Sequence, residues 1–134
     1  MKHLNIFKAN KGLEVHTDTR GVIADIFFNA DIHHAALVRS EPGAIRGNHY
    51  HKISIQHMLI VRGSLEYWFR ELGDQGIGEM FLAEYGDLIR SDSNEIHALR
   101  IGSEGCDFIA FSTGLRGGSD YELDTFRVDS IIGE

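Results

Sequence analysis

Cysteine and proline are almost absent from this chain of 134 residues. Because Cys106 is the single cysteine, no intramolecular disulfide can form, and one chain cannot build an all-cysteine metal site. Any metal would therefore need His, Asp, Glu or amide ligands. Pro42 is the single proline, and because Gly43 follows it, the pair favours a turn between strands.

Long apolar runs and an excess of positive charge are also missing. Residues 58–61 form a typical apolar run, far shorter than the ~20 residues that span a bilayer. Residues 1–8 lack the apolar region and cleavage site of a secretory signal, so we expect a cytoplasmic protein. Thirteen Lys and Arg against 20 Asp and Glu give a formal net charge of −7, opposite to the basic surface of a nucleic-acid-binding protein. We therefore expect neither nucleic acid nor membrane partners, whereas a local positive pocket for a small phosphorylated ligand can still form from Arg39, Arg46, Lys52 and Arg62.

The composition is that of one globular domain. Hydrophobic residues make up 43% of the chain and charged residues 25%, and the length suits a single domain over residues 1–134. Residues 20–113 consist of short β-rich runs separated by Gly, Asp, Asn or Ser, without helical periodicity. We therefore predict an all-β sandwich or barrel there, flanked by N- and C-terminal arms. The predicted strands cover residues 21–28, 35–40, 56–62, 65–70, 79–83, 97–101 and 107–112.

Glycines mark the predicted turns. Gly63 lies between two strong β runs and predicts a hairpin over residues 61–65, and residues 73–78 predict a looser turn. Residues 114–120 are expected to form a loop, and residues 121–128 are either an extended arm or a short helix. Residues 3–6 and 13–16 are candidates for edge strands or for pairing with another subunit.

Two histidines at positions i and i+2 provide the first chemical signal. In an extended strand His49 and His51 point to the same face, about 7 Å apart at Cα, and can converge on one ion or one substrate. Gln56 begins a strongly β run five residues later, and His97 begins another strand. Together these residues offer three imidazoles and an amide.

The spacing of these residues resembles the cupin superfamily. The run Gly43-x5-His49-x-His51-x4-Gln56-x6-Gly63 resembles the first cupin motif, and Gly86-x10-His97 has the spacing of the second, so the resemblance covers about residues 43–101. It implies a single-domain RmlC-like jelly-roll barrel, also called a double-stranded β-helix. It further implies a divalent metal in the barrel mouth, held by His49, His51, Gln56 and His97.

The sequence departs from the usual cupin pattern in ways that affect the metal. Gln56 stands where most metal-binding cupins have Glu, so the site lacks a negative charge and affinity for a divalent ion should be lower. Three imidazoles suit transition metals better than Mg²⁺ or Ca²⁺. Zinc is the default expectation, with Fe, Ni, Cu or Mn as alternatives. In the second motif Asp92, Asn94 and Ile101 replace Pro, Gly and Asn, although Asn94 tolerates a left-handed backbone.

The segment Arg46-Gly47-Asn48-His49-Tyr50-His51-Lys52 is similar to cupins that act on nucleotide-linked sugars, namely 3,4-ketoisomerases and the cupin parts of capsule-sugar reductase/epimerase enzymes. The resemblance implies an isomerase or epimerase that moves a proton next to a carbonyl. Imidazole, with an unperturbed pKa of ~6.5, suits both removal and return of that proton. One of His49 and His51 is expected to be the base and the other the acid. Arg46 would bind the diphosphate or an enolate oxygen, with Tyr50 or Tyr67 as proton donor.

Several alternatives stay open. A nitrogen bound to metal cannot also abstract a proton, so a metal would instead polarise the carbonyl and leave Tyr50, Tyr67 or Glu95 as base. A metal-dependent oxygenase with three histidines and a non-catalytic module that binds metal or sugar are the other candidates. His57 is expected to be structural, and Cys106 a small buried residue.

A homodimer is expected because small jelly-roll domains hide their sheet edges by association. The predicted contact is the apolar tail at Ile131 and Ile132 together with the aromatic strand at residues 67–69.

Overall fold

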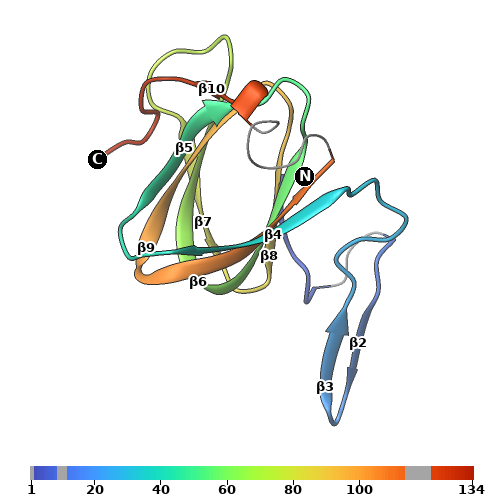
Figure 1. The fold of residues 1–134 in the computed structure, drawn as a ribbon. Coiled ribbons are helices and arrows are strands. Elements are labelled where there is room, and N and C mark those ends of the chain that lie inside the picture. Colours follow the sequence, from blue (N-terminus) through green and yellow to red (C-terminus); the bar gives the residue numbers. More distant parts are fainter. Residues whose placement is uncertain (1, 9–11, 114–121) are drawn as a thin grey trace.

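The computed structural model describes residues 2–8, 12–113 and 122–134, whose strands form a barrel with a projecting hairpin (Figure 1). No helix among these residues is long and apolar enough to cross a membrane. The strands are β1 (His3–Asn5), β2 (Val15–Asp18), β3 (Gly21–Ala24), β4 (His34–Ser40), β5 (Ile45–Tyr50), β6 (Gln56–Glu71), β7 (Glu79–Glu84), β8 (Asp87–Ser91), β9 (Glu95–Ser112) and β10 (Phe126–Arg127).

Two long strands, β6 and β9, take part in both walls of the barrel. The first half of β6 pairs with β8 and with the end of β9, and β1 and β4 add to the outer sides of β8 and β9. The second half of β6 pairs with β7 and with the start of β9, which continues through β5 to β10. These two antiparallel sheets form the predicted jelly roll, in which each long strand bends from one sheet into the other.

The bend in β6 lies at Gly63, where the pairing with β9 shifts its register. Gly63 has a φ of 76°, and a Cβ there would lie 2.0 Å from the carbonyl oxygen of Gly105. The predicted hairpin at residues 61–65 is therefore wrong. Gly63, with its positive φ, instead forms a β-bulge that bends one continuous strand. The backbones of β6 and β9 lie too close together here for any side chain at this position.

The predicted strands 35–40 and 79–83 are confirmed as β4 and β7, whereas other predicted strands are fragments of longer ones. The predicted strands 97–101 and 107–112 are two parts of the single strand β9. β8 was not predicted, because Asp87 and Arg90 leave only a short apolar run between them. The strand predicted over residues 21–28 ends at Ala24. The left-handed backbone expected at Asn94 is present, with a φ of 64°.

The main core lies between the two sheets. It contains Met58, Ile60, Leu65, Tyr67, Ile89, Leu99, Ile101 and Phe108. The aromatic strand contributes Tyr67, which is completely buried, and Cys106 is also buried as expected. This core holds the strands rigidly beneath the site.

The C-terminal tail closes a second cluster on the barrel. Ile131 is fully buried against Trp68 and Ile96, with Val128 and Ile132 packed beside them. The surface predicted for dimerisation, the apolar tail with the aromatic strand, is thus covered within the chain itself. The predicted arm over residues 121–128 has its extended part at β10, whereas residues 114–121 lie outside the described part of the chain.

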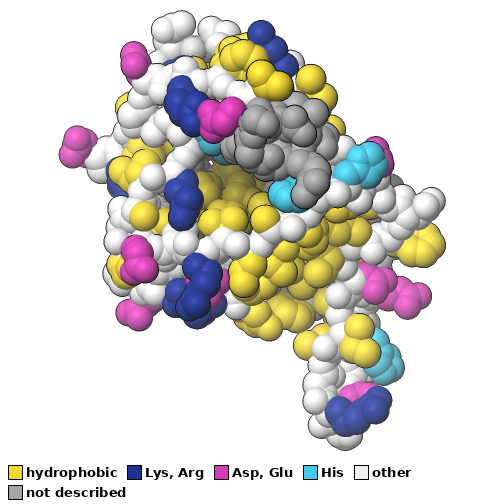
Figure 2. Space-filling view, viewed as in Figure 1, with side chains coloured by type: hydrophobic (Ala, Val, Ile, Leu, Met, Phe, Trp, Pro, Cys, Tyr) yellow, Lys and Arg dark blue, Asp and Glu magenta, His cyan; other side chains and the backbone are white. Residues whose placement is uncertain are grey.

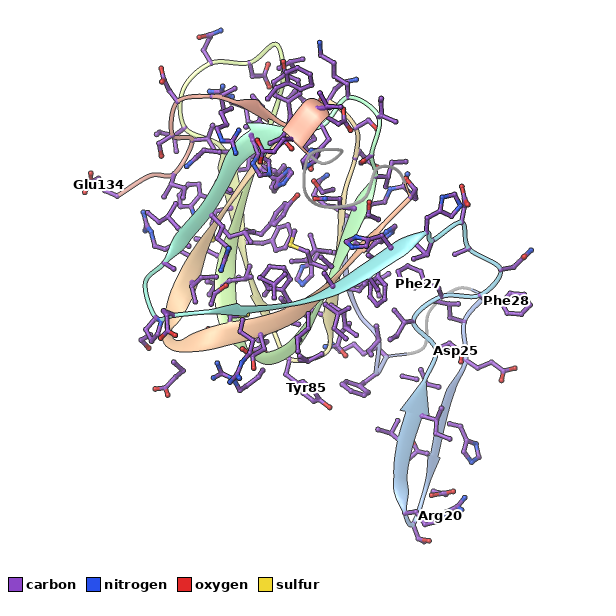
Figure 3. The ribbon with its side chains drawn as sticks, viewed as in Figure 1. Arg20, Asp25, Phe27, Phe28, Tyr85 and Glu134 are labelled. Carbon is purple, nitrogen blue, oxygen red and sulfur yellow. The ribbon has the colours of Figure 1, made fainter. Side chains whose placement is uncertain are left out.

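The N-terminal arm contains one of the edge strands expected from its sequence and one separate hairpin. β1 is an edge strand on β8, whereas β2 and β3 pair with each other in a hairpin that stands away from the barrel, with Arg20 at its tip (Figures 1 and 3). Val22 and Ile23 in this hairpin are 45% and 68% exposed, and Phe28 at its base is 78% exposed. The hairpin therefore presents apolar side chains to its surroundings.

Candidate active site

Three histidines converge on one wall of the barrel interior. His49 lies in β5, His51 directly follows that strand, and His97 lies opposite His49 in β9. The ring centroids are 4.9 Å apart for His49 and His51, 4.7 Å for His49 and His97, and 5.5 Å for His51 and His97. One nitrogen from each ring lies within 4.8 Å of the other two. The structure therefore brings together the three imidazoles that the sequence motifs identified.

A β-bulge in β5 sets the direction of His49. Gly47 and Asn48 have φ values of 87° and 57°, and the pairing with β9 shifts between Gly47 and His49. A Cβ on Gly47 would lie 2.7 Å from the carbonyl oxygen of His97, so this close approach of the two strands needs glycine. The Asn48 side-chain oxygen accepts a hydrogen bond from the Ile131 N–H at 3.0 Å, and its carbonyl accepts one from the Val128 N–H at 2.9 Å. The tail thus anchors the bulge beside His49.

A backbone carbonyl selects the tautomer of one ring. His51 Nδ1 lies 2.8 Å from the Asp124 carbonyl oxygen, and because a carbonyl can only accept, this Nδ1 carries a hydrogen. His97 Nδ1 lies 3.0 Å from Ser91 Oγ, a hydroxyl that can donate or accept, and 3.4 Å from the Glu95 carbonyl oxygen.

Burial keeps the imidazoles of His49 and His97 uncharged. Burial, followed by the proximity of His49 and His51, lowers the pKa of His97 to about 3. Burial, followed by the proximity of His51 and Arg127, lowers the pKa of His49 to about 4. His49 and His97 are therefore neutral bases near pH 7, available for coordination or for proton transfer.

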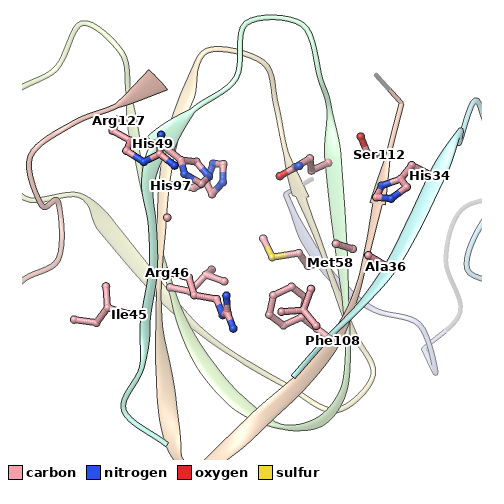
Figure 4. A pocket seen from close by; sticks show the side chains of 15 residues that line it. His34, Ala36, Ile45, Arg46, His49, Met58, His97, Phe108, Ser112 and Arg127 are labelled. Atoms are coloured by element: carbon pink, nitrogen blue, oxygen red, sulfur yellow. The ribbon is translucent and has the colours of Figure 1, made fainter. Parts of the chain in front are cut away.

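A cavity of about 480 Å³ opens beside the histidines. Figure 2 shows it as a hollow with hydrophobic side chains inside, and in Figure 4 His49, His97 and Arg127 lie at one end of it, away from Met58 and Phe108. The lining residues are His34, Ala36, Val38, Ile45, Arg46, Gly47, His49, Gln56, Met58, His97, Leu99, Phe108, Ala110, Ser112 and Arg127. The lining thus combines an apolar floor, an amide, two guanidinium groups and three imidazoles, of which His34 lies apart from the histidine cluster.

The two arginines of the cavity are held by neighbouring groups. Arg46 Nε donates to Ser40 Oγ at 2.8 Å, which directs this predicted anion-binding side chain along the cavity wall. Arg127 forms an ion pair with Glu122 at 3.1 Å and lies opposite His49 in the pairing of β10 with β5. Arg127 was not predicted from the sequence, because it belongs to no motif and reaches the site only through this strand pairing.

Gln56 and the tyrosines differ in where the structure places them. Gln56 lines the cavity with His49 and His97, as its predicted role requires. Tyr50 packs against Phe126, with ring centroids 5.3 Å apart, and does not line the cavity.

Tyr67 lies in the core behind His97, with the two rings nearly parallel and their centroids 6.3 Å apart. Its hydroxyl donates to Glu95 Oε1 at 3.3 Å. Burial, with the nearby Glu95 carboxylate, raises the pKa of Tyr67 far above its usual range, so this phenol holds its proton. Burial also raises the pKa of Glu95, whose carboxylate is paired with Lys2.

His57 lies outside the site. Its ring packs edge-on against Phe27 with centroids 5.0 Å apart, and it does not line the cavity. This agrees with a structural role, and it makes His57 a useful control for the histidines of the cavity.

Comparison with known proteins places the barrel in a family. Residues 16–111 match the family model described as the polysaccharide biosynthesis C-terminal domain. The chain belongs to the polysaccharide biosynthesis C-terminal domain family. A UDP-2-acetamido-2,6-beta-L-arabino-hexul-4-ose reductase from Pseudomonas aeruginosa is 29% identical to this family member over 58 residues, which are 43% of the chain and 16% of the reductase. The chain thus corresponds to only about a sixth of this curated relative.

Solved structures show the same RmlC-like cupin fold. A 3,4-ketoisomerase from Helicobacter canadensis superimposes with a TM-score of 0.74 at 17% identity, covering 95% of this chain and 90% of the isomerase. A histidine-to-asparagine mutant of the 3,4-ketoisomerase QdtA from Thermoanaerobacterium thermosaccharolyticum, in complex with TDP-4-keto-6-deoxyglucose, gives a TM-score of 0.70 at 16% identity, covering 87% of this chain and 83% of QdtA. The resemblance to cupins inferred from the two motifs is therefore confirmed for the fold.

Proposed function

We propose that this barrel is an isomerase or epimerase that binds a nucleotide-linked sugar in the cavity and moves a proton next to the sugar carbonyl. The observation that supports it most is the presence of two neutral imidazoles, the buried His97 and the partly buried His49, in a cavity wall that also carries Arg46 and Arg127. A neutral base beside cationic groups is what such a reaction on an anionic substrate needs. The nucleotide-sugar complex of the similar ketoisomerase QdtA agrees with this substrate class.

His49 is the proposed base, because it lines the cavity and is only partly buried, whereas His51 does not line it. The His49 imidazole takes the proton from the carbon next to the carbonyl, and the electron pair of the broken C–H bond moves to the carbonyl oxygen as an enolate. Protonation of the same carbon from the opposite face, by a donor other than His49, gives the epimer. For the isomer, a proton is added to the former carbonyl carbon, and the hydroxyl proton on the carbon that lost its hydrogen moves to the enolate oxygen, so that the carbonyl now lies at that carbon. Arg46 and Arg127 supply positive charge for the diphosphate and for the enolate oxygen.

The histidine cluster also supports a second candidate, a metal centre. Three imidazole nitrogens within 4.8 Å of one another fit a divalent transition metal, and Gln56 adds an amide in the same cavity. When bound, zinc, iron, nickel or manganese would supply a Lewis acid for an oxygen of the ligand. A three-histidine oxygenase or a non-catalytic binding module would share this centre.

An assay on matched histidine variants tests the proposal. The wild-type chain, His49→Ala and His57→Ala are each incubated with a nucleotide-linked 4-keto sugar, and NMR follows the stereochemistry and the carbonyl position. We expect turnover by the wild type and by His57→Ala, and a loss of at least about 100-fold in His49→Ala, the scale of general acid–base catalysis. Equal turnover by His49→Ala and the wild type would contradict the proposed role of His49.

Elemental analysis distinguishes the two uses of the cluster. Protein purified without a metal-affinity step is analysed beside His97→Ala. Near-stoichiometric metal that disappears with His97 would establish the metal centre and remove His49 as the base. A metal-free wild type with sugar turnover would support proton transfer by His49.

A further inference from the structure

A single carboxylate holds the connection that carries His51. Residues 51–55 join β5 to β6 without strand pairing. The backbone N–H groups of Lys52, Ile53 and Ser54 all donate to the Asp124 carboxylate, at 2.9, 3.2 and 3.0 Å. Asp124 and Ser54 are each only 3% exposed. The buried Asp124 therefore satisfies three successive backbone donors in an irregular connection, of which Ser54 is buried whereas the side chains of Lys52 and Ile53 are exposed.

The same residue also holds the His51 ring. The Asp124 main-chain carbonyl accepts the hydrogen bond from His51 Nδ1 at 2.8 Å. The carboxylate thus orients the backbone that follows His51, while the carbonyl orients the imidazole itself. Two separate groups of Asp124 therefore restrain His51, one through the backbone and one through the ring.

The charge and the anchoring of Asp124 suit this role. Burial by itself opposes ionisation, but the N–H groups of Ser54, Lys52 and Ile53 hold the pKa of the Asp124 carboxyl below its usual range. The next element, β10, pairs with β5 through Phe126 with Tyr50 and Arg127 with His49. The segment that carries Asp124 is therefore fastened to the strand that carries the cluster.

We infer that Asp124 is a positioning residue, which keeps His51 in one tautomer and holds its ring in the histidine cluster. The inference deepens the proposed function, since it gives the C-terminal segment a part in the site. An outer partner that orients a ligating or reacting histidine typically contributes about 10- to 100-fold to affinity or activity. The sequence gives no hint of this partner, because Asp124 lies 73 positions from His51.

The first test needs no substitution. Long-range ¹H–¹⁵N NMR of the intact wild-type chain reports which nitrogen of each histidine carries the hydrogen. In the neutral form of the His51 ring, we expect the hydrogen to lie on Nδ1. A His51 ring protonated at Nε2, or exchanging between both tautomers, would overturn the inference.

The second test compares Asp124→Asn with Asp129→Asn. Both variants remove one negative charge from the C-terminal segment, but Asp129 is exposed, whereas Asp124 is buried beneath the connection. In Asp124→Asn the amide NH₂ would face backbone donors, so we expect a mixture of His51 tautomers and a Zn²⁺ affinity about 10- to 100-fold lower. Asp129→Asn should match the wild type in both measurements.

Asp124→Glu covers the case in which Asp124→Asn does not fold. This variant keeps the charge but displaces the carboxylate by one methylene, and we expect an intermediate change in the tautomer signal. An unchanged His51 tautomer in a folded Asp124 variant would overturn the inference. Absence of sugar turnover in a wild type whose His51 tautomer depends on Asp124 would reject the proposed function and leave the inference standing.

Discussion

At the scale of single residues, the site depends on where two backbones meet and on what burial does to imidazoles. Gly47 lets β5 approach the His97 carbonyl, and the bulge that follows turns His49 toward His97. Once the rings are buried together, protonation of His49 or His97 is disfavoured. Local backbone geometry and charge state are thus two consequences of the same close packing.

Gly47→Ala should destabilise the protein more than Gly43→Ala. Both glycines have positive φ values, 87° and 76°, so both variants incur a left-handed backbone cost of about 1–2 kcal/mol. A Cβ at Gly43 meets nothing within 4 Å, whereas one at Gly47 would force the His97 backbone to move, adding about 1–3 kcal/mol. Urea unfolding of the two variants measures the difference, and equal stabilities would refute the role given to the close approach.

The free energy of unfolding should fall between pH 6.5 and pH 5 in chelator-treated protein. Below the usual histidine pKa of 6.5, the unfolded chain binds protons at His49 and His97 that the folded chain does not bind. Stability is therefore greatest above pH 6.5 and decreases by at most about 1.4 kcal/mol per pH unit for each histidine as the pH drops toward 4. Urea unfolding from pH 7 to pH 5 measures how the free energy of unfolding depends on pH. We expect a shallower dependence in His97→Gln than in the wild type. A wild-type free energy that does not change over this range would contradict the prediction.

At the scale of elements, periodicity predicted the β class, whereas the resemblance to cupins implied the jelly roll and the residues of the cluster. His49 and His51 share a face because the two-residue alternation of a strand persists to the end of β5. The continuity of β6 through Gly63 was not predictable, because a glycine that bends a strand and one that reverses the chain give the same local signal. The partners of the cluster, Arg127 and Asp124, depend on long-range pairing of the C-terminal segment, which leaves no periodic pattern in the sequence.

The C-terminal tail should behave as part of the core. Ile131 is fully buried against Trp68, so Ile131→Ala should cost about 2–5 kcal/mol of unfolding free energy. Leu123→Ala, at a position 77% exposed in the same segment, should change stability by less than about 0.5 kcal/mol. Chemical denaturation compares the two, and a near-neutral Ile131→Ala would mean that the tail is not needed for packing.

At the scale of the whole molecule, the barrel covers 90% of a ketoisomerase structure but only 16% of its reductase relative. Its cavity and its projecting hairpin lie on different parts of the chain, since the lining contains no residue of β2 or β3. Substitutions in the hairpin therefore leave the residues that line the cavity unchanged.

A homodimer is still expected, with a contact surface other than the predicted tail. The β2–β3 hairpin exposes Val22 and Ile23, and Leu37 on β4 is 64% exposed. An isolated two-stranded hairpin is marginal in water without packing, so a second copy is the expected cover. Light scattering should give about twice 15.0 kDa for the wild type. Ile23→Asp should lower the measured mass toward that of one chain, whereas Leu82→Asp, at an exposed position on β7, should leave it unchanged. A wild-type mass near 15.0 kDa would exclude the dimer.

Solvent exchange tests the central claim, proton transfer next to a sugar carbonyl in this cavity, most directly. The wild-type chain is incubated in D₂O with a nucleotide-linked 4-keto sugar, and NMR locates any deuterium in the ring. The account predicts deuterium at the carbon next to the carbonyl, at a rate that falls to the buffer background in His49→Ala and is unchanged in His57→Ala. Exchange no faster than the buffer background with wild-type protein, across the common nucleotide-linked 4-keto sugars, would contradict the account.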